Sequence, residues 1–129
     1  MLLFVVACSS PQIPETNKFT LKIGEIAKYE DLSLKFLGVT EDSRCPLGVM
    51  CIQAGRVVTS FQVMIDGASS FLEFSTEGPT VIKKSTPADW DYYIWLNEVT
   101  PIRRQGEAID PDEYVVALEI TKGDEVNSP

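Results

Sequence analysis

The fold is decided by the stretch Arg56-Val57-Val58-Thr59-Ser60-Phe61-Gln62-Val63-Met64-Ile65-Asp66-Gly67. Its odd-numbered positions from Val57 to Ile65 point to one side of an extended chain, and the residues between them point to the other side. Asp66-Gly67 is a dipeptide typical of tight hairpin turns, and the apolar segment Phe71-Leu72-Glu73-Phe74 follows it. The sequence therefore predicts a β-hairpin here.

Alternating apolar residues occur on both sides of this hairpin. Leu32, Leu34 and Phe36 alternate with polar residues, and Leu37-Gly38-Val39 then breaks the phase as a β-bulge would. Beyond a turn at Glu77-Gly78-Pro79, we expect a strand at Thr80-Val81-Ile82-Lys83-Lys84. The next strand is expected to place Tyr92, Ile94 and Leu96 on one face and Tyr93, Trp95 and Val99 on the other. The inner face of the last strand is expected to comprise Tyr114, Val116, Leu118 and Ile120.

These segments define the fold class. No stretch shows an apolar period of 3.6, and the eight Gly and eight Pro residues separate the short strands. The sequence therefore predicts an all-β fold, an antiparallel β-sandwich of about seven strands that is either immunoglobulin-like or a small barrel. Asp110 stands four residues before Tyr114, a spacing seen in the tyrosine corner of immunoglobulin-like sandwiches, although a turn followed by a core tyrosine explains it as well.

Length and composition restrict the function. A chain of 129 residues corresponds to one domain, and 19 acidic against 11 basic residues give a net charge of −8. This charge repels phosphate backbones, so nucleic acid is not an expected partner. The chain has no histidine, which excludes Ser-His and Cys-His catalysis and every histidine-based metal site.

The amino terminus has the pattern of an export signal. Residues 1–7 form an apolar run that ends in a small residue before Cys8, and it is too short to cross a bilayer as a helix. The alternative is a buried N-terminal strand. Val5-Val6-Ala7-Cys8 resembles a bacterial lipobox, which implies cleavage before Cys8 and acylation of its sulfur and its amine. No basic residue precedes Lys18, so the signal departs from the usual pattern. Two explanations are open: the given start lies inside a longer signal, or the start codon is misassigned.

This resemblance implies a division of the chain. Residues 8–17 would be the lipidated cysteine and a proline-containing tether, residues 18–123 a single β domain, and residues 124–129 a polar tail. Ser9, directly after the lipidated cysteine, implies sorting to the outer membrane of a diderm bacterium, with the domain on the periplasmic face. The expected location is thus the cell envelope, with the lipid anchor holding the chain to a membrane.

Cys45 and Cys51 are the two other cysteines, and five residues separate them, among them Pro46 and Gly48. Because disulfides persist outside the cytosol, we expect a structural Cys45–Cys51 bridge. A redox-active pair usually has two intervening residues, and a two-cysteine metal site would lack histidine partners.

The surroundings of these cysteines carry the most specific pattern of the chain. Asp42-Ser43-Arg44-Cys45-Pro46 and Cys51-Ile52-Gln53-Ala54-Gly55 resemble a group of small, functionally uncharacterised bacterial lipoproteins or secreted proteins with a D-S-R-C-P and C-x-x-A-G signature. The segments 91–101 and 109–118 resemble the closing strands of that group, which often has tryptophan in place of Gln53. The resemblance implies a fold and an envelope location, and it implies no activity.

Three further candidates concern sites. Arg44 near Asp42 predicts a salt bridge that orients the loop, with an exposed contact for an anionic ligand as the alternative. If exposed, the aromatic residues Trp90, Tyr93 and Trp95 would form a contact patch. The candidate calcium ligands are Asp89, Asp91, Asp110 and Asp112. The alternative is that these residues only form turns, which aspartate favours. We identify no catalytic residue and no cofactor.

Our leading hypothesis is therefore non-enzymatic: an envelope lipoprotein that acts as a binding or assembly module. One alternative is an acidic inhibitor of a basic, lysozyme-type enzyme that attacks the envelope, since a net charge of −8 favours a protein partner with a basic surface. A second alternative is an enzyme that depends on calcium or on carboxylates.

Overall fold

The computed structural model describes residues 17–83 and 91–123. These residues form eight strands and one turn of 3-10 helix, η1 (Pro111–Glu113). The strands are β1 (Lys18–Lys22), β2 (Ile26–Tyr29), β3 (Leu32–Asp42), β4 (Val57–Ile65), β5 (Ala68–Ser75), β6 (Thr80–Ile82), β7 (Asp91–Thr100) and β8 (Val115–Gly123). The prediction of an all-β fold is confirmed.

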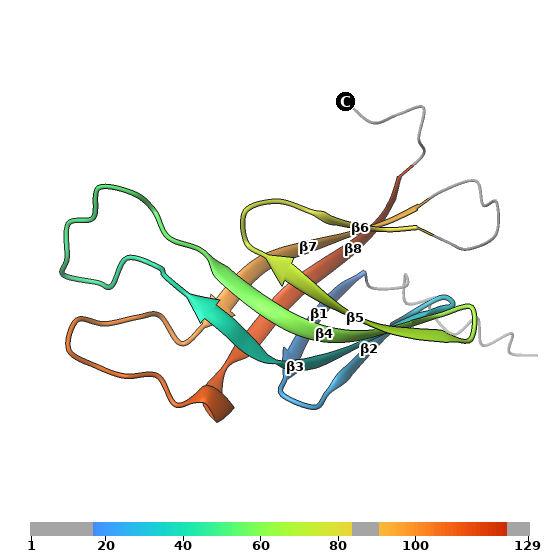
Figure 1. The fold of residues 1–129 in the computed structure, drawn as a ribbon, viewed down its shortest axis with the longest axis horizontal. Coiled ribbons are helices and arrows are strands. Elements are labelled where there is room, and N and C mark those ends of the chain that lie inside the picture. The colour runs from blue at the N-terminus through green and yellow to red at the C-terminus, as the bar shows by residue number, and fades with distance from the viewer. Residues whose placement is uncertain (1–16, 84–90, 124–129) are drawn as a thin grey trace, which may run out of the picture.

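The strands form two four-stranded antiparallel sheets, in the orders β1-β8-β7-β6 and β2-β3-β4-β5. Figure 1 shows the two sheets as the layers of a sandwich. Each sheet is a meander of consecutive strands, and β1 is added beside β8. Immunoglobulin domains instead interleave strands that are distant in the sequence, so the order here is closer to that of an up-and-down barrel that opens into two sheets.

The hairpin that the sequence predicts joins β4 and β5. Ile65 pairs with Ala68, and the two residues between them, Asp66 and Gly67, have φ angles of 52° and 77°. Positive φ angles at both central residues define a turn whose twist matches that of the flanking strands. Glycine adopts such an angle without steric cost, which explains Gly67.

One apolar core lies between the two sheets. β4 contributes Val57, Thr59, Phe61 and Val63, all fully buried, as the alternation predicts. The ring of Phe61 packs at 5.3 Å from that of Phe36 and 4.7 Å from that of Phe74, measured between centroids. Among the described residues, Thr59 is the polar residue that is buried in this core. Its hydroxyl donates a hydrogen bond of 2.9 Å to the carbonyl of Phe74.

Three register shifts, two in β3 and one in β7, alter the alternation. The predicted break in β3 is present as register shifts between Phe36 and Gly38 and between Val39 and Glu41. A further shift in β7 between Leu96 and Glu98 adds one residue to that strand. Val99 therefore faces the core and is buried, and its predicted position on the outer face was wrong.

Several predictions fall outside the described residues. These are the signal segment 1–7, Cys8, the tether up to residue 16, the tail 124–129, and the site candidates Asp89 and Trp90. Within the part of the chain that the structure describes, no helix has the length and apolar character needed to span a bilayer.

The aromatic cluster on β4 makes a first prediction about stability. Replacing Phe61 by Ala should lower the free energy of unfolding by about 3–5 kcal/mol, because it opens a cavity between two packed rings. Urea denaturation followed by fluorescence measures this change. Phe71→Ala is the matched control, since Phe71 lies on the outer side of β5 with 69% of its surface exposed. It should change the stability by less than about 0.5 kcal/mol.

Candidate functional site

Two loops project from the same end of the sandwich (Figure 1). The disulfide loop, residues 43–56, connects β3 with β4, and the Pro101 loop, residues 101–114, connects β7 with β8. The amide of Leu47 donates a hydrogen bond of 2.9 Å to the carbonyl of Arg103, and the amide of Gln105 donates one of 3.4 Å to the carbonyl of Leu47. This parallel bridge places the two loops side by side.

The disulfide between Cys45 and Cys51 is present as predicted, with a Cα–Cα distance of 5.9 Å. It closes a ring of seven residues, because the two cysteines are six positions apart. In the chain-entropy model, a ring of this size contributes about 2 kcal/mol to stability. Its local effect is to restrict the conformations of residues 46–50 within the disulfide loop.

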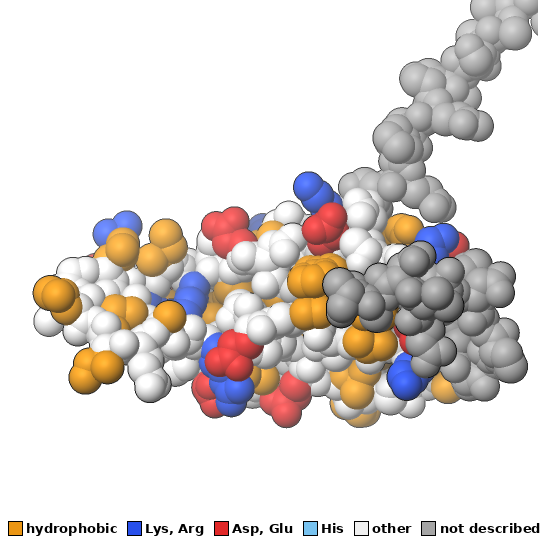
Figure 2. Space-filling model, turned by 90° about the horizontal axis from the view of Figure 1, so that it is seen from above, with side chains coloured by type: hydrophobic (Ala, Val, Ile, Leu, Met, Phe, Trp, Pro, Cys, Tyr) orange, Lys and Arg blue, Asp and Glu red, His pale blue; other side chains and the backbone are white. Residues whose placement is uncertain are grey.

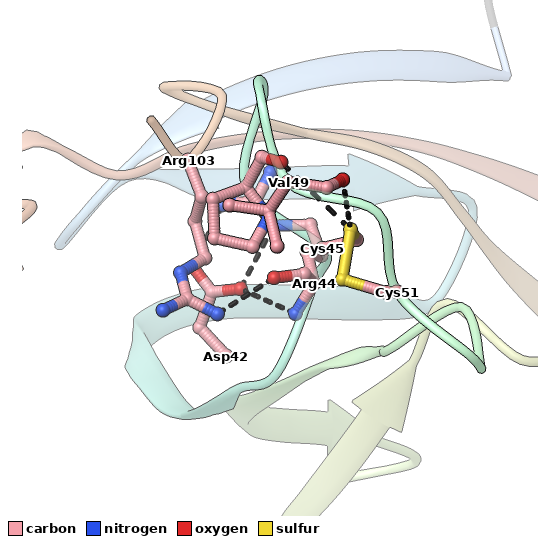
Figure 3. The surroundings of a disulfide bond; sticks show 7 residues. Asp42, Arg44, Cys45, Val49, Cys51 and Arg103 are labelled. Carbon is pink, nitrogen blue, oxygen red and sulfur yellow. Dashed lines mark hydrogen bonds and ion pairs between the residues drawn. A yellow bond between two sulfur atoms is a disulfide. The ribbon is translucent and has the colours of Figure 1, made fainter. Parts of the chain in front are cut away.

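Arg44 forms the predicted ion pair with Asp42 and also joins the two loops. Its Nε and Nη2 atoms donate to the two carboxylate oxygens of Asp42 at 2.8 and 2.7 Å. Its Nη1 atom donates to the carbonyl of Val99 at 2.5 Å, and Nη2 also donates to that of Pro101 at 2.9 Å. Arg103 in turn donates from Nη1 to the carbonyl of Arg44 at 2.6 Å (Figure 3). Arg44 thus acts as a structural tie.

Tyr114 completes this cluster. Its hydroxyl donates a hydrogen bond of 2.9 Å to Oδ2 of Asp42, a residue 72 positions earlier in the chain. A tyrosine corner would instead bond to backbone a few residues upstream, so this feature of immunoglobulin-like sandwiches is not what positions Tyr114. Asp110 caps η1, where its side chain accepts a hydrogen bond of 3.0 Å from the amide of Asp112.

The cluster fixes the charge states of its members. Burial by itself would raise the pKa of Asp42, but the hydrogen bonds from Arg44 and Tyr114 outweigh it, so the pKa of this carboxyl is lowered. The pKa of Tyr114 is raised by burial and by the bond to the Asp42 carboxylate. The hydrogen bond to Asp42 raises the pKa of Arg44 above its ordinary value. Asp42 is therefore held ionised and Tyr114 neutral.

Gly55 is a residue of this region whose role the sequence pattern did not reveal. A Cβ atom at position 55 would lie 1.6 Å from the carbonyl oxygen of Ser43, because the two ends of the disulfide loop approach each other there. The amide of Ser43 donates a hydrogen bond of 2.8 Å to the carbonyl of Arg56 just beside it. Only glycine permits this approach, which explains the glycine that ends the C-x-x-A-G pattern.

The outer surface of the two loops is apolar. We define the apolar tip as its five exposed aliphatic side chains: Leu47, Val49, Met50, Ile52 and Ile102. Met50 and Ile52 are fully exposed. Figure 2 shows hydrophobic side chains at this end of the molecule. Sequence reasoning missed the tip, although three of its aliphatic residues, Leu47, Val49 and Met50, stand inside a short disulfide-closed ring. They were a usable signal, since so small a ring has no interior to bury them.

The charge near the apolar tip differs from that of the whole chain. The segments 43–55 and 101–106 contain no Asp or Glu, although the chain has 19 acidic residues. The same segments contain Arg44, Arg103 and Arg104. Arg44 is paired with Asp42, Arg103 is half-buried, and Arg104 is exposed. Glu107 lies in the same turn as Arg104, since its amide donates a hydrogen bond of 3.1 Å to the carbonyl of Arg104, and Asp110, Asp112 and Glu113 follow further along the Pro101 loop. Arginines therefore stand next to the aliphatic side chains, while the two loops as a whole carry both signs of charge.

The aromatic residues predicted as a contact patch lie elsewhere. Tyr93 and Trp95 are on the outer face of the sheet that contains β7, Tyr93 half-buried and Trp95 with 39% of its surface exposed. The indole Nε1 of Trp95 donates a hydrogen bond of 3.0 Å to the hydroxyl of Thr121. Val81 pairs with Tyr93 and is also exposed on this face. These residues form a patch on a strand surface that is separate from the apolar tip.

The structure does not bring the calcium candidates together. Asp91 pairs with Gly123 at one end of the β7–β8 ladder, whereas Asp110 and Asp112 lie beyond the other end, where Thr100 pairs with Val115. Asp91 and Thr100, the two ends of β7, are nine positions apart, which corresponds to about 30 Å of extended chain. Within 17–83 and 91–123 there is no group of three or more His, Cys, Asp or Glu residues that could hold a metal ion.

A shallow depression on the outer side of β3, β4 and β5 is the other place where carboxylates gather. Arg56 donates to Glu41 at 2.7 Å and to Glu77 at 3.4 Å, and the hydroxyl of Thr40 donates to Glu73 at 3.0 Å. The bond from Arg56 lowers the pKa of Glu41. A general acid at neutral pH needs a raised pKa, so the environment of Glu41 favours a structural role.

Comparison of the chain with protein-family models, with curated proteins and with solved structures gives no match.

The Asp42 cluster makes a prediction about pH. A carboxyl whose pKa is lowered by folding stabilises the protein above its ordinary pKa of 3.8, and this contribution is lost as the pH falls through the folded-state value. Asp42→Asn should lower the free energy of unfolding at pH 7 by about 1–3 kcal/mol, because partly buried donors lose an ionised acceptor. The difference from the parent protein should shrink at pH values below 3.8.

Urea denaturation at a series of pH values between neutrality and the acid range measures this difference. Asp112→Asn is the control, since Asp112 is exposed and lies in the same Pro101 loop. Its stability should follow that of the parent protein at each pH. A difference between Asp42→Asn and the parent that stays constant with pH would contradict the assignment.

Proposed function

We propose that the protein is a lipoprotein of the cell envelope that acts as a non-catalytic binding module, anchored through Cys8 and presenting the apolar tip to its partner. The observation that carries this proposal is the set of five exposed aliphatic side chains on two joined loops. A periplasm-facing position at the outer membrane follows from the lipobox resemblance and belongs to the same proposal.

The arrangement of the tip supports binding. Exposed aliphatic side chains that gather at one place are uncommon on monomeric proteins, and such patches mark sites of interaction. The disulfide and the contacts of Arg44 hold both loops in one conformation. A partner therefore binds a surface that is already arranged, and less conformational entropy is lost on association.

The position of the N-terminal strand supports the anchor. β1 begins at Lys18, which pairs with Glu119, and runs towards Lys22, which pairs with Val115. Val115 is the first residue of β8 after the Pro101 loop, so the chain enters the sandwich away from the tip and runs towards it. A tether of residues 9–17 spans about 25–30 Å when extended. An anchor at Cys8 would thus leave the tip accessible.

The hypothesis of an acidic inhibitor gains less support, because a basic target surface requires carboxylates at the contact. The apolar tip has none in the two segments that form it. Four described acidic residues, Glu107, Asp110, Asp112 and Glu113, follow in the Pro101 loop, and the others are distributed over strands and turns along the sandwich, for example Glu30, Glu73 and Glu119.

The anchor is tested by Cys8→Ser. The parent protein should remain in the membrane pellet after a high-salt wash, because several acyl chains on one residue hold a protein stably. The variant should be released by the same wash, and intact-mass measurement should show acylation at Cys8 in the parent only. Retention of the variant in the washed pellet, with no acyl mass on the parent, would refute the anchor.

The binding role of the tip is tested by a photoreactive residue at position 50, introduced into the protein in cells. Because Met50 is fully exposed at the tip, irradiation should give adducts of increased mass. The matched control carries the same residue at position 71, where Phe71 is exposed on the outer side of β5. Equal labelling at both positions, or none at position 50, would count against a binding site at the tip.

A further inference from the structure

We propose that the apolar tip inserts into the headgroup region of a bilayer that contains anionic phospholipids. The inference rests on the proposed function, since it names the partner of the binding site proposed there. Three observations lead to it: the shape of the tip, the placement of its arginines, and the contacts that fix its loops.

The shape of the tip fits a bilayer. The loops project beyond the ends of the strands, and they lie at one end of the longest axis of the molecule (Figures 1 and 2). Met50 and Ile52 are fully exposed, so no neighbouring side chain covers their apolar surface. Projecting aliphatic side chains enter the acyl boundary of a membrane without a complementary pocket, whereas a protein partner must supply one for each side chain.

The arginines stand directly beside the aliphatic residues. Arg103 and Arg104 follow Ile102 in the sequence, and the backbone bridge between Leu47 and Arg104 brings the disulfide loop next to them. A guanidinium donates several hydrogen bonds in a plane that matches the oxygens of a phosphate group. Arg103 already donates to the carbonyl of Arg44, whereas Arg104 is exposed, so Arg104 supplies the guanidinium that would meet a phosphate next to the inserted aliphatic side chains.

Part of the net charge of −8 lies too far from the tip to oppose this contact. At physiological ionic strength the field of a charge is screened over about 8 Å. The strand β3 alone has 11 residues, which corresponds to about 35 Å, so carboxylates at its far end, such as Glu30, lie several screening lengths from the tip. Nearer the tip, Glu107 partly offsets the attraction that Arg104 supplies.

Rigid loops keep the aliphatic side chains exposed. The Cys45–Cys51 ring restricts the conformations of residues 46–50, and Arg44 fixes the base of the loop through the carbonyls of Val99 and Pro101. The apolar surface is therefore available before a membrane is met. Insertion then requires no rearrangement of the loops.

The experiment uses the full oxidised chain with Cys8→Ser, which removes the acyl anchor, and measures sedimentation with two kinds of vesicle. One kind is phosphatidylcholine alone, and the other is phosphatidylcholine mixed with phosphatidylglycerol. The chain should bind the mixed vesicles more tightly. Adding Met50→Ser and Ile52→Ser should weaken this binding more than about tenfold, because two fully exposed side chains no longer reach the acyl boundary.

Two further variants separate charge from apolar contact. Arg104→Gln should weaken binding to the mixed vesicles about fivefold and leave binding to phosphatidylcholine unchanged. Phe71→Ser should change neither, since it removes an exposed apolar side chain from the outer side of β5. The apolar run 1–7 is present in every variant, so only the differences between variants are attributed to the tip. Thermal unfolding confirms that the variants are folded.

Two results would overturn the inference. One is sedimentation of the Met50→Ser, Ile52→Ser chain equal to that of its parent, and the other is no binding of the parent to mixed vesicles. If position 50 nevertheless gives protein adducts in cells, the partner at the tip is a protein, and the proposed binding function stands without the membrane. If position 50 gives no adduct in cells and the vesicles are not bound, both proposals fail.

Discussion

Arg44 lies where three parts of the chain meet, and both loops at this end of the sandwich depend on its guanidinium. It is bound bidentately by Asp42 at the end of β3, and it donates to the carbonyls of Val99 and Pro101 at the end of β7. A partly buried ion pair contributes little net stability, because desolvation offsets much of the attraction. Its planar fork nevertheless fixes the direction of each bond. The pair therefore determines how the loops are arranged more than how stable the domain is.

The strands could be predicted from the sequence because their pattern is local. Alternation from Val57 to Val63 has period two, and Asp66-Gly67 adopts the positive φ angles that such a turn requires. Reasoning from alternation alone failed at Val99. Asn97 and Glu98 are both polar and both exposed, so the sequence does not reveal the bulge that shifts the strand by one residue at that point. After the shift, Val99 is buried and its carbonyl is available to Arg44.

The contacts of the site are likewise of two kinds, those between residues close in the sequence and those between residues far apart in it. The Asp42–Arg44 pair and the Cys45–Cys51 bridge join residues within a few positions of each other, and the residue types alone suggested both. The bond from Tyr114 to Asp42 and the contact between Leu47 and Arg104 depend on how two loops from different sheets meet, which no local pattern contains. The many aromatic residues near β7 led us to predict a contact patch, and the structure places them on a strand surface. The exposed aliphatic residues of the apolar tip, by contrast, come together only in the folded chain.

The distribution of charge also changes what the net charge implies. Summed over the chain, −8 favours a basic partner, but a sum carries no information about position. At one end of the longest axis the structure places arginines and aliphatic side chains together with the four carboxylates of the Pro101 loop, while the other described carboxylates lie along the strands and in their turns. Near an anionic surface, attraction at the tip and repulsion of the body act in opposite directions on the two ends of the molecule. An acidic body therefore weakens such a contact only through carboxylates that lie within a screening length of the surface. The others oppose an approach by the sides of the sandwich, so that the tip is the part that touches the surface.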